Sequence, residues 1–227
     1  GQVVMVDLVA QPAKNSEPVA RVTEVLGNYA DPGMEIEIAL RKHDLPYIWP
    51  DDVEALEKKV PKKVTAADIK GRAALRDLPF VETARDFDDA VYCERQGKGF
   101  RLLVAIADVS HYVKTGDALD REARLRGNSV YFPRRVIPML PEALSNEMCS
   151  LKPNVDRLAL VCEMSISSTG EIKRYEFMEA VFHSAARLTY TNVAKLLYAN
   201  EPDHGIAKNL WPHMHHLDEV FQVLLAA

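Results

Sequence analysis

The stretch Arg85-Asp86-Phe87-Asp88-Asp89 leads directly into an apolar run, Ala90–Glu94, that is typical of a β-strand. A second apolar run, Phe100–Ala107, follows after a short glycine-containing turn, so the two runs are predicted to pair as a hairpin. The same pattern returns in Leu158–Ser165 and Glu171–Phe177. These two hairpins predict a mixed α+β domain in the second part of the chain.

Toward the N-terminus, residues 1 to about 48 contain three short strand candidates, Gln2–Val9, Val19–Leu26 and Met34–Leu40. In the third candidate, apolar residues alternate with glutamates, which is the period of a half-buried strand. Turn signals rich in proline, glycine and asparagine separate the three runs. Several short strands at this spacing predict a small β-barrel of the OB type.

The remaining segments are less regular. Asp51 is predicted to cap a short helix, and Lys58–Arg76 is interpreted as a lysine-rich linker whose charges are solvated. Asn128–Asn154 is rich in proline and polar residues with little periodicity, which is typical of a long, functional loop. Thr191–Tyr198 and His213–Leu225 are predicted helices.

Three carboxylates, Asp86, Asp88 and Asp89, fall within four positions. Like charges at this density are best tolerated when a cation neutralises them or when all of them are solvated. Oxygen ligands favour Mg²⁺, or Mn²⁺, over zinc. The cluster is therefore a candidate metal site and catalytic site, and the alternative is a solvated acidic turn.

Composition sets outer limits on the class of protein. The 227 residues are 48% apolar, enough for a core, and the net charge is −5. Nucleic acid would therefore have to bind in a local groove. Cys93, Cys149 and Cys162 lack the spacing of a zinc knuckle or a disulfide framework. No run approaches a membrane span, and Gly1-Gln2-Val3 does not begin like a signal peptide, so a cytoplasmic protein without membrane contact is expected.

Five motifs follow one another in the second part of the chain. In chain order they are Ala84-Arg85-Asp86-Phe87-Asp88-Asp89-Ala90-Val91, Val104-Ala105-Ile106-Ala107-Asp108-Val109-Ser110, Arg126-Gly127-Asn128-Ser129-Val130-Tyr131-Phe132-Pro133, Ile137-Pro138-Met139-Leu140-Pro141 and Leu144-Ser145-Asn146. The series resembles the catalytic domain of the ribonuclease II/ribonuclease R family. The first part, with Asp44-Leu45-Pro46-Tyr47-Ile48-Trp49-Pro50, resembles the cold-shock domain that precedes it.

The resemblance implies a processive, Mg²⁺-dependent 3′-to-5′ exoribonuclease that hydrolyses single-stranded RNA to nucleoside 5′-monophosphates. Family members hold the metal on four aspartates, three of which match Asp86, Asp88 and Asp89. The family's tyrosine that contacts the terminal nucleotide matches Tyr131. The resemblance also implies three segments: a cold-shock domain at 1–50, a helix and linker at 51–78, and the first part of the catalytic domain at 79–227. A monomer is expected.

The chain departs from the family pattern at two places. Val81 runs directly into Glu82-Thr83, so about four positions that include the first metal aspartate are absent. The chain stops at Ala227, within the expected catalytic domain, so the domain is expected to be incomplete. Two alternatives to the exoribonuclease therefore stay open: an RNA-binding fragment without cleavage, and a nuclease or phosphodiesterase on another substrate such as DNA.

Several further residues have a functional and a structural interpretation. Arg134 and Arg135, beside Tyr131, are candidate RNA phosphate ligands, with Arg134 favoured, and arginines 121, 124 and 126 could line the same groove. Asp108 is interpreted as a strand-end aspartate that bonds the backbone rather than as a metal ligand. The histidines at 213, 215 and 216 are interpreted as a solvated helix start rather than a zinc site.

Overall fold

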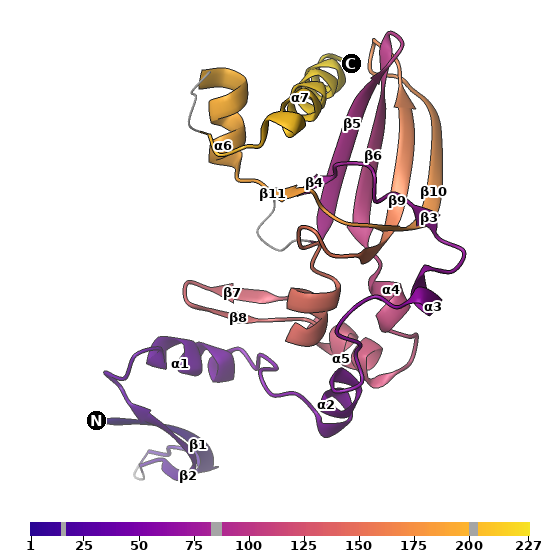
Figure 1. Ribbon diagram of the computed structural model, residues 1–227. Coiled ribbons are helices and arrows are strands. Elements are labelled where there is room, and N and C mark those ends of the chain that lie inside the picture. Colours follow the sequence, from indigo (N-terminus) through magenta and orange to yellow (C-terminus); the bar gives the residue numbers. More distant parts are fainter. Residues whose placement is uncertain (15–16, 83–87, 200–203) are drawn as a thin grey trace. The chain divides into compact units, whose positions relative to one another are not determined.

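The computed structural model describes residues 1–14, 17–82, 88–199 and 204–227. Within them the chain forms two compact units (Figure 1). One unit combines residues 1–50 with 125–139, and the other combines residues 51–124 with 140–227. The hairpin that carries Tyr131 therefore belongs to the same unit as the N-terminal segment.

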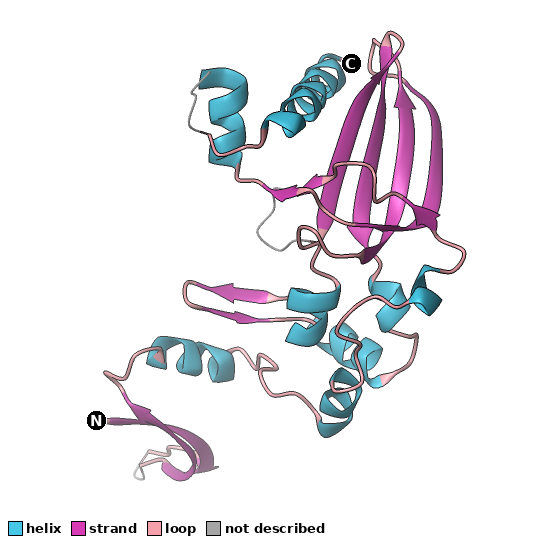
Figure 2. Cartoon of the chain, in the orientation of Figure 1, coloured by secondary structure: helices cyan, strands magenta, loops and turns pink. Residues whose placement is uncertain are grey.

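The larger unit is built on a sheet whose described strands lie in the order β11-β4-β5-β6-β9-β10-β3. The central four strands are antiparallel, and the edge strands β3 and β11 pair in parallel. Both predicted hairpins are confirmed, with the second continuing beyond its expected end (Figure 2). The strands are β3 (Ala73–Ala74), β4 (Val81–Glu82), β5 (Asp89–Gln96), β6 (Gly99–Ala107), β9 (Arg157–Ile166), β10 (Ile172–Phe182) and β11 (Ala186–Arg187).

Alternation along the strands gives the sheet two different faces. On one face Cys93, Phe100 and Ile166 are buried against Val220 of helix α7 (Trp211–Ala226). On the opposite face Arg101 forms salt bridges with glutamates of the neighbouring strands β5 and β9. The face of Arg101 is not simply polar, because Leu103 and Ala105 on the same face are fully buried. Both faces of the sheet therefore contribute to the core.

The helices are short apart from α7. They are α1 (Met34–Lys42), α2 (Asp51–Glu57), α3 (Ala66–Ile69), α4 (Val109–Tyr112), α5 (Ala118–Arg126), α6 (Tyr190–Ala194) and α7, with π-helical turns at Ala143–Met148 and Lys195–Ala199 and a 3₁₀ turn at Lys208–Leu210. The predicted helices near residues 51, 191 and 213 are confirmed. No described helix is both long enough and apolar enough to cross a membrane.

Two segments that were predicted to be irregular contain regular structure. The expected loop Asn128–Asn154 includes the hairpin of β7 (Val130–Phe132) and β8 (Arg135–Ile137), followed by a π-helical turn. The expected linker Lys58–Arg76 includes helix α3, where the side chain and backbone amide of Thr65 both bond the Asp68 carboxylate at 2.7 Å. These segments are short, so they carry too few residues for a periodic signal.

The smaller unit contains β1 (Gln2–Ala10), β2 (Val19–Asn28), helix α1 and the β7–β8 hairpin. The first two predicted strands are confirmed and pair antiparallel, with irregularities in register along the ladder. Helix α1 and the hairpin share a core in which Ile36, Leu40 and Ile137 are buried. The segment that bears Tyr131 is thus held by residues of the N-terminal segment.

The third predicted strand, Met34–Leu40, is wrong, because this segment is helix α1. Gly33, at φ 85°, turns the chain into the helix in a left-handed conformation that glycine adopts without strain. Within the helix, Arg41 donates to the Glu37 carboxylate one turn earlier at 2.6 Å. An alternation of apolar residues also contains pairs four apart, so the pattern fits a helix as well as a strand.

We expect Leu40→Ala to destabilise the smaller unit by about 2–5 kcal/mol, because Leu40 is fully buried and its truncation leaves a cavity. Leu125→Ala in the same unit removes a side chain that is 72% exposed and serves as the control. Urea denaturation followed by Trp49 fluorescence in a Trp211→Phe background reports on this unit. Equal losses for both variants would contradict the assigned core.

Candidate functional site

Two of the three predicted metal ligands can be placed, because Asp86 lies outside the described residues. Asp88 is exposed and immediately precedes β5, and its carbonyl accepts a hydrogen bond from the Ala107 amide at 2.8 Å. Asp89 is the first residue of β5, is half-buried and pairs in register with Ile106. The ladder between β5 and β6 therefore holds both aspartates at one end of the sheet.

The carboxylates of Asp88 and Asp89 form no hydrogen bond or ion pair with another described residue. Two adjacent carboxylates that are not engaged elsewhere fit Mg²⁺, which usually takes one or two protein carboxylates and completes its shell with water and phosphate. Among the described residues no group of three histidine, cysteine, aspartate or glutamate side chains is arranged to hold a metal ion. Asp88 and Asp89 therefore supply oxygen donors of the kind that a hard cation prefers, but they do not form a complete site among the described residues.

A buried thiol lies close to these charges. Burial raises the pKa of the Cys149 thiol to about 12, and the negative charges of Asp108 and Asp88 act in the same direction. The Cys149 side chain consequently stays protonated at neutral pH and is not a nucleophile.

Asp108 has the structural role that the sequence favoured. It caps helix α4, where its carboxylate accepts from the Ser110 hydroxyl at 2.6 Å and the His111 amide at 3.1 Å. Arg72 donates to the second oxygen at 2.7 Å, and the Asp108 side chain is only 1% exposed. Burial by itself would raise the pKa of Asp108, but the hydrogen bonds from Ser110 and Arg72 and the charge of Arg72 outweigh it and lower the pKa.

Arg72 connects this aspartate to helix α3. Its Nε donates to the Asp68 carbonyl at 3.0 Å, and its Nη2 lies 3.3 Å from Nδ1 of His111. Because a guanidinium can only donate, His111 Nδ1 accepts, and the ring proton lies on Nε2, which is 3.1 Å from the Asp68 carboxylate. The four side chains form one network that ties the expected linker to the end of β6.

Sequence reasoning missed the contribution of Arg72, Asp68 and His111. The available signal was Thr65-Ala66-Ala67-Asp68, which has the spacing of a reciprocal cap at the start of a helix. The ion pair of Arg72 with Asp108 joins residues 36 positions apart, and a local sequence pattern does not predict such a contact. The interpretation of the segment as a free linker is therefore wrong for its second half.

Tyr131 and Arg134 lie on the β7–β8 hairpin of the smaller unit, so they are described apart from the acidic residues of the larger unit. Tyr131 pairs in register with Val136, and the residue is 55% exposed. Arg134 is exposed in the turn. An exposed ring next to an exposed guanidinium is a suitable surface for single-stranded nucleic acid.

The other candidate arginines are engaged within the protein. Arg121 pairs with Asp52 at 2.9 Å, and Arg124 pairs with Asp120 at 3.2 Å. Arg126 lies 3.4 Å from the ring centroid of Trp49 and donates to two backbone carbonyls. Arg126 therefore fixes the local structure of the smaller unit rather than lining an open groove.

The histidines of α7 form no zinc site within the described residues. His215 is exposed, as expected for a solvated helix start, but His213 and His216 are half-buried. The His213 ring packs against Tyr92 with centroids 5.1 Å apart. The expectation of a solvated start is thus wrong for these two residues, which pack on the sheet.

We expect Asp108→Asn to lower the free energy of unfolding at pH 7 by about 3–5 kcal/mol, because the buried Arg72 would lose its nearer carboxylate partner and keep only Glu179 at 3.6 Å. The folded-state pKa of Asp108 is lowered, so its contribution is present above the unfolded pKa and is lost as the pH falls through the folded pKa. The difference between the two proteins should therefore shrink below about pH 4. Urea denaturation at several pH values measures it, with exposed Asp77→Asn as control. A difference independent of pH would contradict the assigned ion pair.

The comparisons with known proteins agree with this architecture. A family model described as the RNB domain matches residues 72–226, and one described as a cold shock domain matches residues 1–50. Ribonuclease R of Escherichia coli (strain K12) is 52% identical over 229 residues, which cover 97% of this chain and 27% of that protein. Ribonuclease R of Vibrio cholerae is 50% identical over 232 residues, which cover 100% of this chain and 28% of that protein.

A solved structure, Mycoplasma genitalium RNase R in complex with double-stranded RNA, superposes with a TM-score of 0.89 at 31% identity. The match covers 99% of this chain and 40% of that one. The chain spans about a quarter of the length of the curated relatives it matches. The predicted fold class, a cold-shock domain followed by a mixed α/β domain, is confirmed. The chain belongs to the RNB-domain family and is similar to ribonuclease R, as its motif series predicted.

Proposed function

We propose that this chain is part of a 3′-to-5′ exoribonuclease that hydrolyses single-stranded RNA to nucleoside 5′-monophosphates in the presence of Mg²⁺. The observation that carries the proposal is the pair of carboxylates, Asp88 and Asp89, which no other described residue engages, at the end of β5 in an RNB domain. The similarity to ribonuclease R over nearly the whole chain supports it.

Asp86, Asp88 and Asp89 would hold the metal. A bound Mg²⁺ supplies positive charge that lowers the pKa of water and stabilises a leaving oxygen at phosphorus. The protein's own contribution is to leave the carboxylates of Asp88 and Asp89 without an ion pair to another described residue. The hydrogen bond from the Ala107 amide fixes the backbone at Asp88. The ion pair with Arg72 occupies the Asp108 carboxylate, so Asp108 is not a metal ligand in this proposal.

The RNA would be held by the β7–β8 hairpin. Tyr131 offers an exposed ring on which a base can stack, and stacking tolerates any sequence. Arg134 offers a guanidinium to the backbone phosphates. Contacts to the ring face and to phosphate are what an enzyme that degrades RNA of many sequences needs, because neither reads a base edge.

An RNA-binding unit without cleavage is the second candidate. The sequence favours it at one place, where Val81 and Glu82 are followed by Thr83 without the positions that would include a further metal aspartate. Fewer carboxylates would weaken the hold on the metal while leaving the hairpin's RNA contacts unchanged. Metal-dependent release of mononucleotides separates the two candidates, because only the nuclease produces it.

We expect Asp88→Asn to abolish release of mononucleotides from a uniformly labelled single-stranded RNA while changing RNA affinity less than about threefold, because the residue acts on the reaction rather than on RNA binding. Product release is followed on a gel in Mg²⁺, and binding is measured by fluorescence anisotropy in EDTA. Exposed Asp77→Asn is the matched control. Comparable cleavage by the Asp88→Asn variant would rule out the role assigned to Asp88.

We expect Tyr131→Ala to weaken binding of single-stranded RNA by about 1–3 kcal/mol, because a stacked base loses its platform. Tyr131→Phe keeps the ring and should bind nearly as well as the wild type. Anisotropy in EDTA separates binding from cleavage. If the Phe variant loses as much affinity as the Ala variant, the hydroxyl group rather than the ring contacts the RNA.

A further inference from the structure

The end of strand β6 holds the backbone beside the candidate metal ligands. The Ala107 amide donates to the Asp88 carbonyl at 2.8 Å, and one position earlier Ile106 pairs in register with Asp89. These contacts fix the main chain of both aspartates, whereas their carboxylates form no hydrogen bond or ion pair with another described residue. The positions of the two carboxylates therefore depend on how firmly β6 is held at its end.

Asp108 secures the chain directly after β6. Its amide donates to the Leu158 carbonyl of β9 at 3.0 Å. Its carboxylate accepts from the Ser110 hydroxyl at 2.6 Å and from the His111 amide at 3.1 Å. Because this carboxylate is buried, it is tolerated only with an opposite charge beside it. The anchor at the end of β6 therefore needs a cation.

Arg72 supplies that cation. Its Nη2 donates to the second oxygen of Asp108 at 2.7 Å, and Glu179 is a more distant carboxylate partner at 3.6 Å. The Arg72 side chain is only 6% exposed, and its Nη1 is buried without a hydrogen-bond partner in the part of the chain that the structure describes. A guanidinium so enclosed has little water to replace a lost carboxylate, so the two charges hold each other in place.

Helices α3 and α4, which lie next to each other near the end of β6, fix the direction of the Arg72 side chain (Figure 1). Nε of Arg72 donates to the Asp68 carbonyl of α3 at 3.0 Å, and the Asp68 carboxylate lies 3.1 Å from Nε2 of His111. The other oxygen of Asp68 accepts from the amide and the hydroxyl of Thr65. A continuous set of hydrogen bonds thus leads from α3 through Arg72 to Asp108.

We propose that Arg72 is a positioning residue for the metal site. By holding Asp108 it keeps the end of β6 in place, and through the Ala107 amide it keeps the backbone of Asp88 where the carboxylate can bind Mg²⁺. Residues that orient metal ligands without touching the metal commonly change metal affinity or activity by about 10–100-fold. The inference rests on the proposed function, in which Asp88 binds the metal, and it adds a residue that itself contacts neither metal nor RNA.

The first measurement is amide hydrogen exchange of the full chain without metal, followed by NMR. We expect Arg72→Gln to speed exchange of the Ala107 amide about tenfold, because local opening at the end of β6 becomes easier. Arg76→Gln is the matched control, since it removes an arginine–aspartate pair of the same unit, with Asp156 at 2.8 Å, that includes no member of this network. An equal change at all amides of the sheet would overturn the positioning role, because it would report only a general loss of stability.

The second measurement is the affinity for Mn²⁺ without RNA, read from the EPR signal of free Mn²⁺. We expect Arg72→Gln to bind Mn²⁺ about tenfold more weakly, and Arg76→Gln to bind it like the wild type. Arg72→Lys keeps a charge beside Asp108 and should recover part of the loss. With RNA present, kcat of Arg72→Gln should fall at low Mg²⁺ and recover at high Mg²⁺, while KM for RNA stays unchanged.

Ser110→Ala covers the case in which Arg72→Gln does not fold. It removes one hydrogen bond to Asp108 and leaves both charges in place, so smaller changes in the same two quantities are expected. Faster exchange at Ala107 with unchanged Mn²⁺ affinity would overturn the role of Arg72 alone. A wild-type chain that binds no Mn²⁺ would instead overturn the proposed metal role of Asp88, and the role of Arg72 would fall with it.

Discussion

The antiparallel pairing of β5 with β6 is the constraint on which the acidic site depends. It places Asp89 opposite Ile106 and joins the Asp88 carbonyl to the amide of Ala107. Because side chains alternate between the faces of a sheet, a shift of one residue would move Asp89 to the opposite face. The register is fixed by buried side chains on both faces, with Cys93 and Phe100 packed under helix α7 and Leu103 buried on the opposite face. A core at one end of the strands thus determines the position of the carboxylates at the other end.

Environment gives neighbouring aspartates different roles. Asp108 is enclosed and paired with Arg72, whereas Asp88 is exposed and forms no hydrogen bond or ion pair through its carboxylate with another described residue. A buried charge must be paired to be tolerated, and a paired carboxylate has little left to offer a metal. A solvated carboxylate pays no such cost and remains available. The ion pair with Arg72 therefore gives Asp108 a structural role, which distinguishes it from the candidate metal ligands Asp88 and Asp89.

Sequence reasoning succeeded where a segment was long and its partner followed directly, as in the hairpin that starts at Asp89. It failed for Met34–Leu40, because an alternating pattern contains helical spacings too and the outcome depended on burial against Ile137, which lies about a hundred residues away. It also failed for Arg72, whose carboxylate partner is distant in sequence. The residue types and their motifs identified Asp88 and Arg134 as candidate site residues. Only the structure shows which of the charged side chains are already paired.

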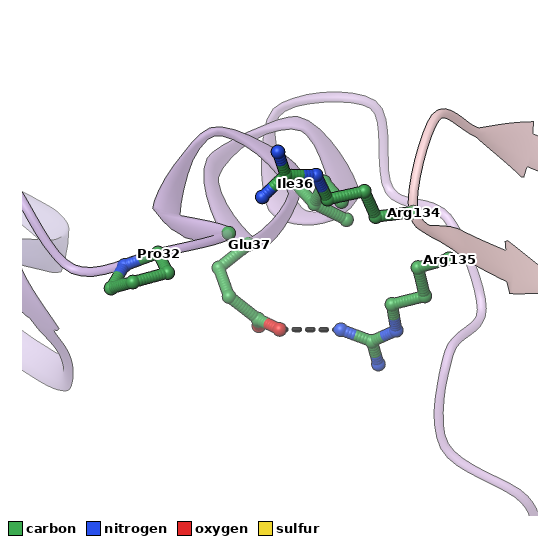
Figure 3. Close-up of a pocket in the computed structure, with 6 residues that line it drawn as sticks. Pro32, Ile36, Glu37, Arg134 and Arg135 are labelled. Atoms are coloured by element: carbon green, nitrogen blue, oxygen red, sulfur yellow. Dashed lines mark hydrogen bonds and ion pairs between the residues drawn. The ribbon is translucent and has the colours of Figure 1, made fainter.

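The location of the hairpin changes how the site is to be understood. Tyr131 and Arg134 belong by sequence to the RNB match, yet the strands that carry them pack on helix α1, within the cold-shock match. A series of ion pairs from Glu24 through Arg41 and Glu37 to Arg135 reinforces that packing. Arg135, the neighbour of Arg134, is therefore already paired with a carboxylate (Figure 3). An acidic protein can therefore hold a few cations in fixed positions on one hairpin. The N-terminal segment, through helix α1, positions the hairpin that carries Tyr131 and Arg134.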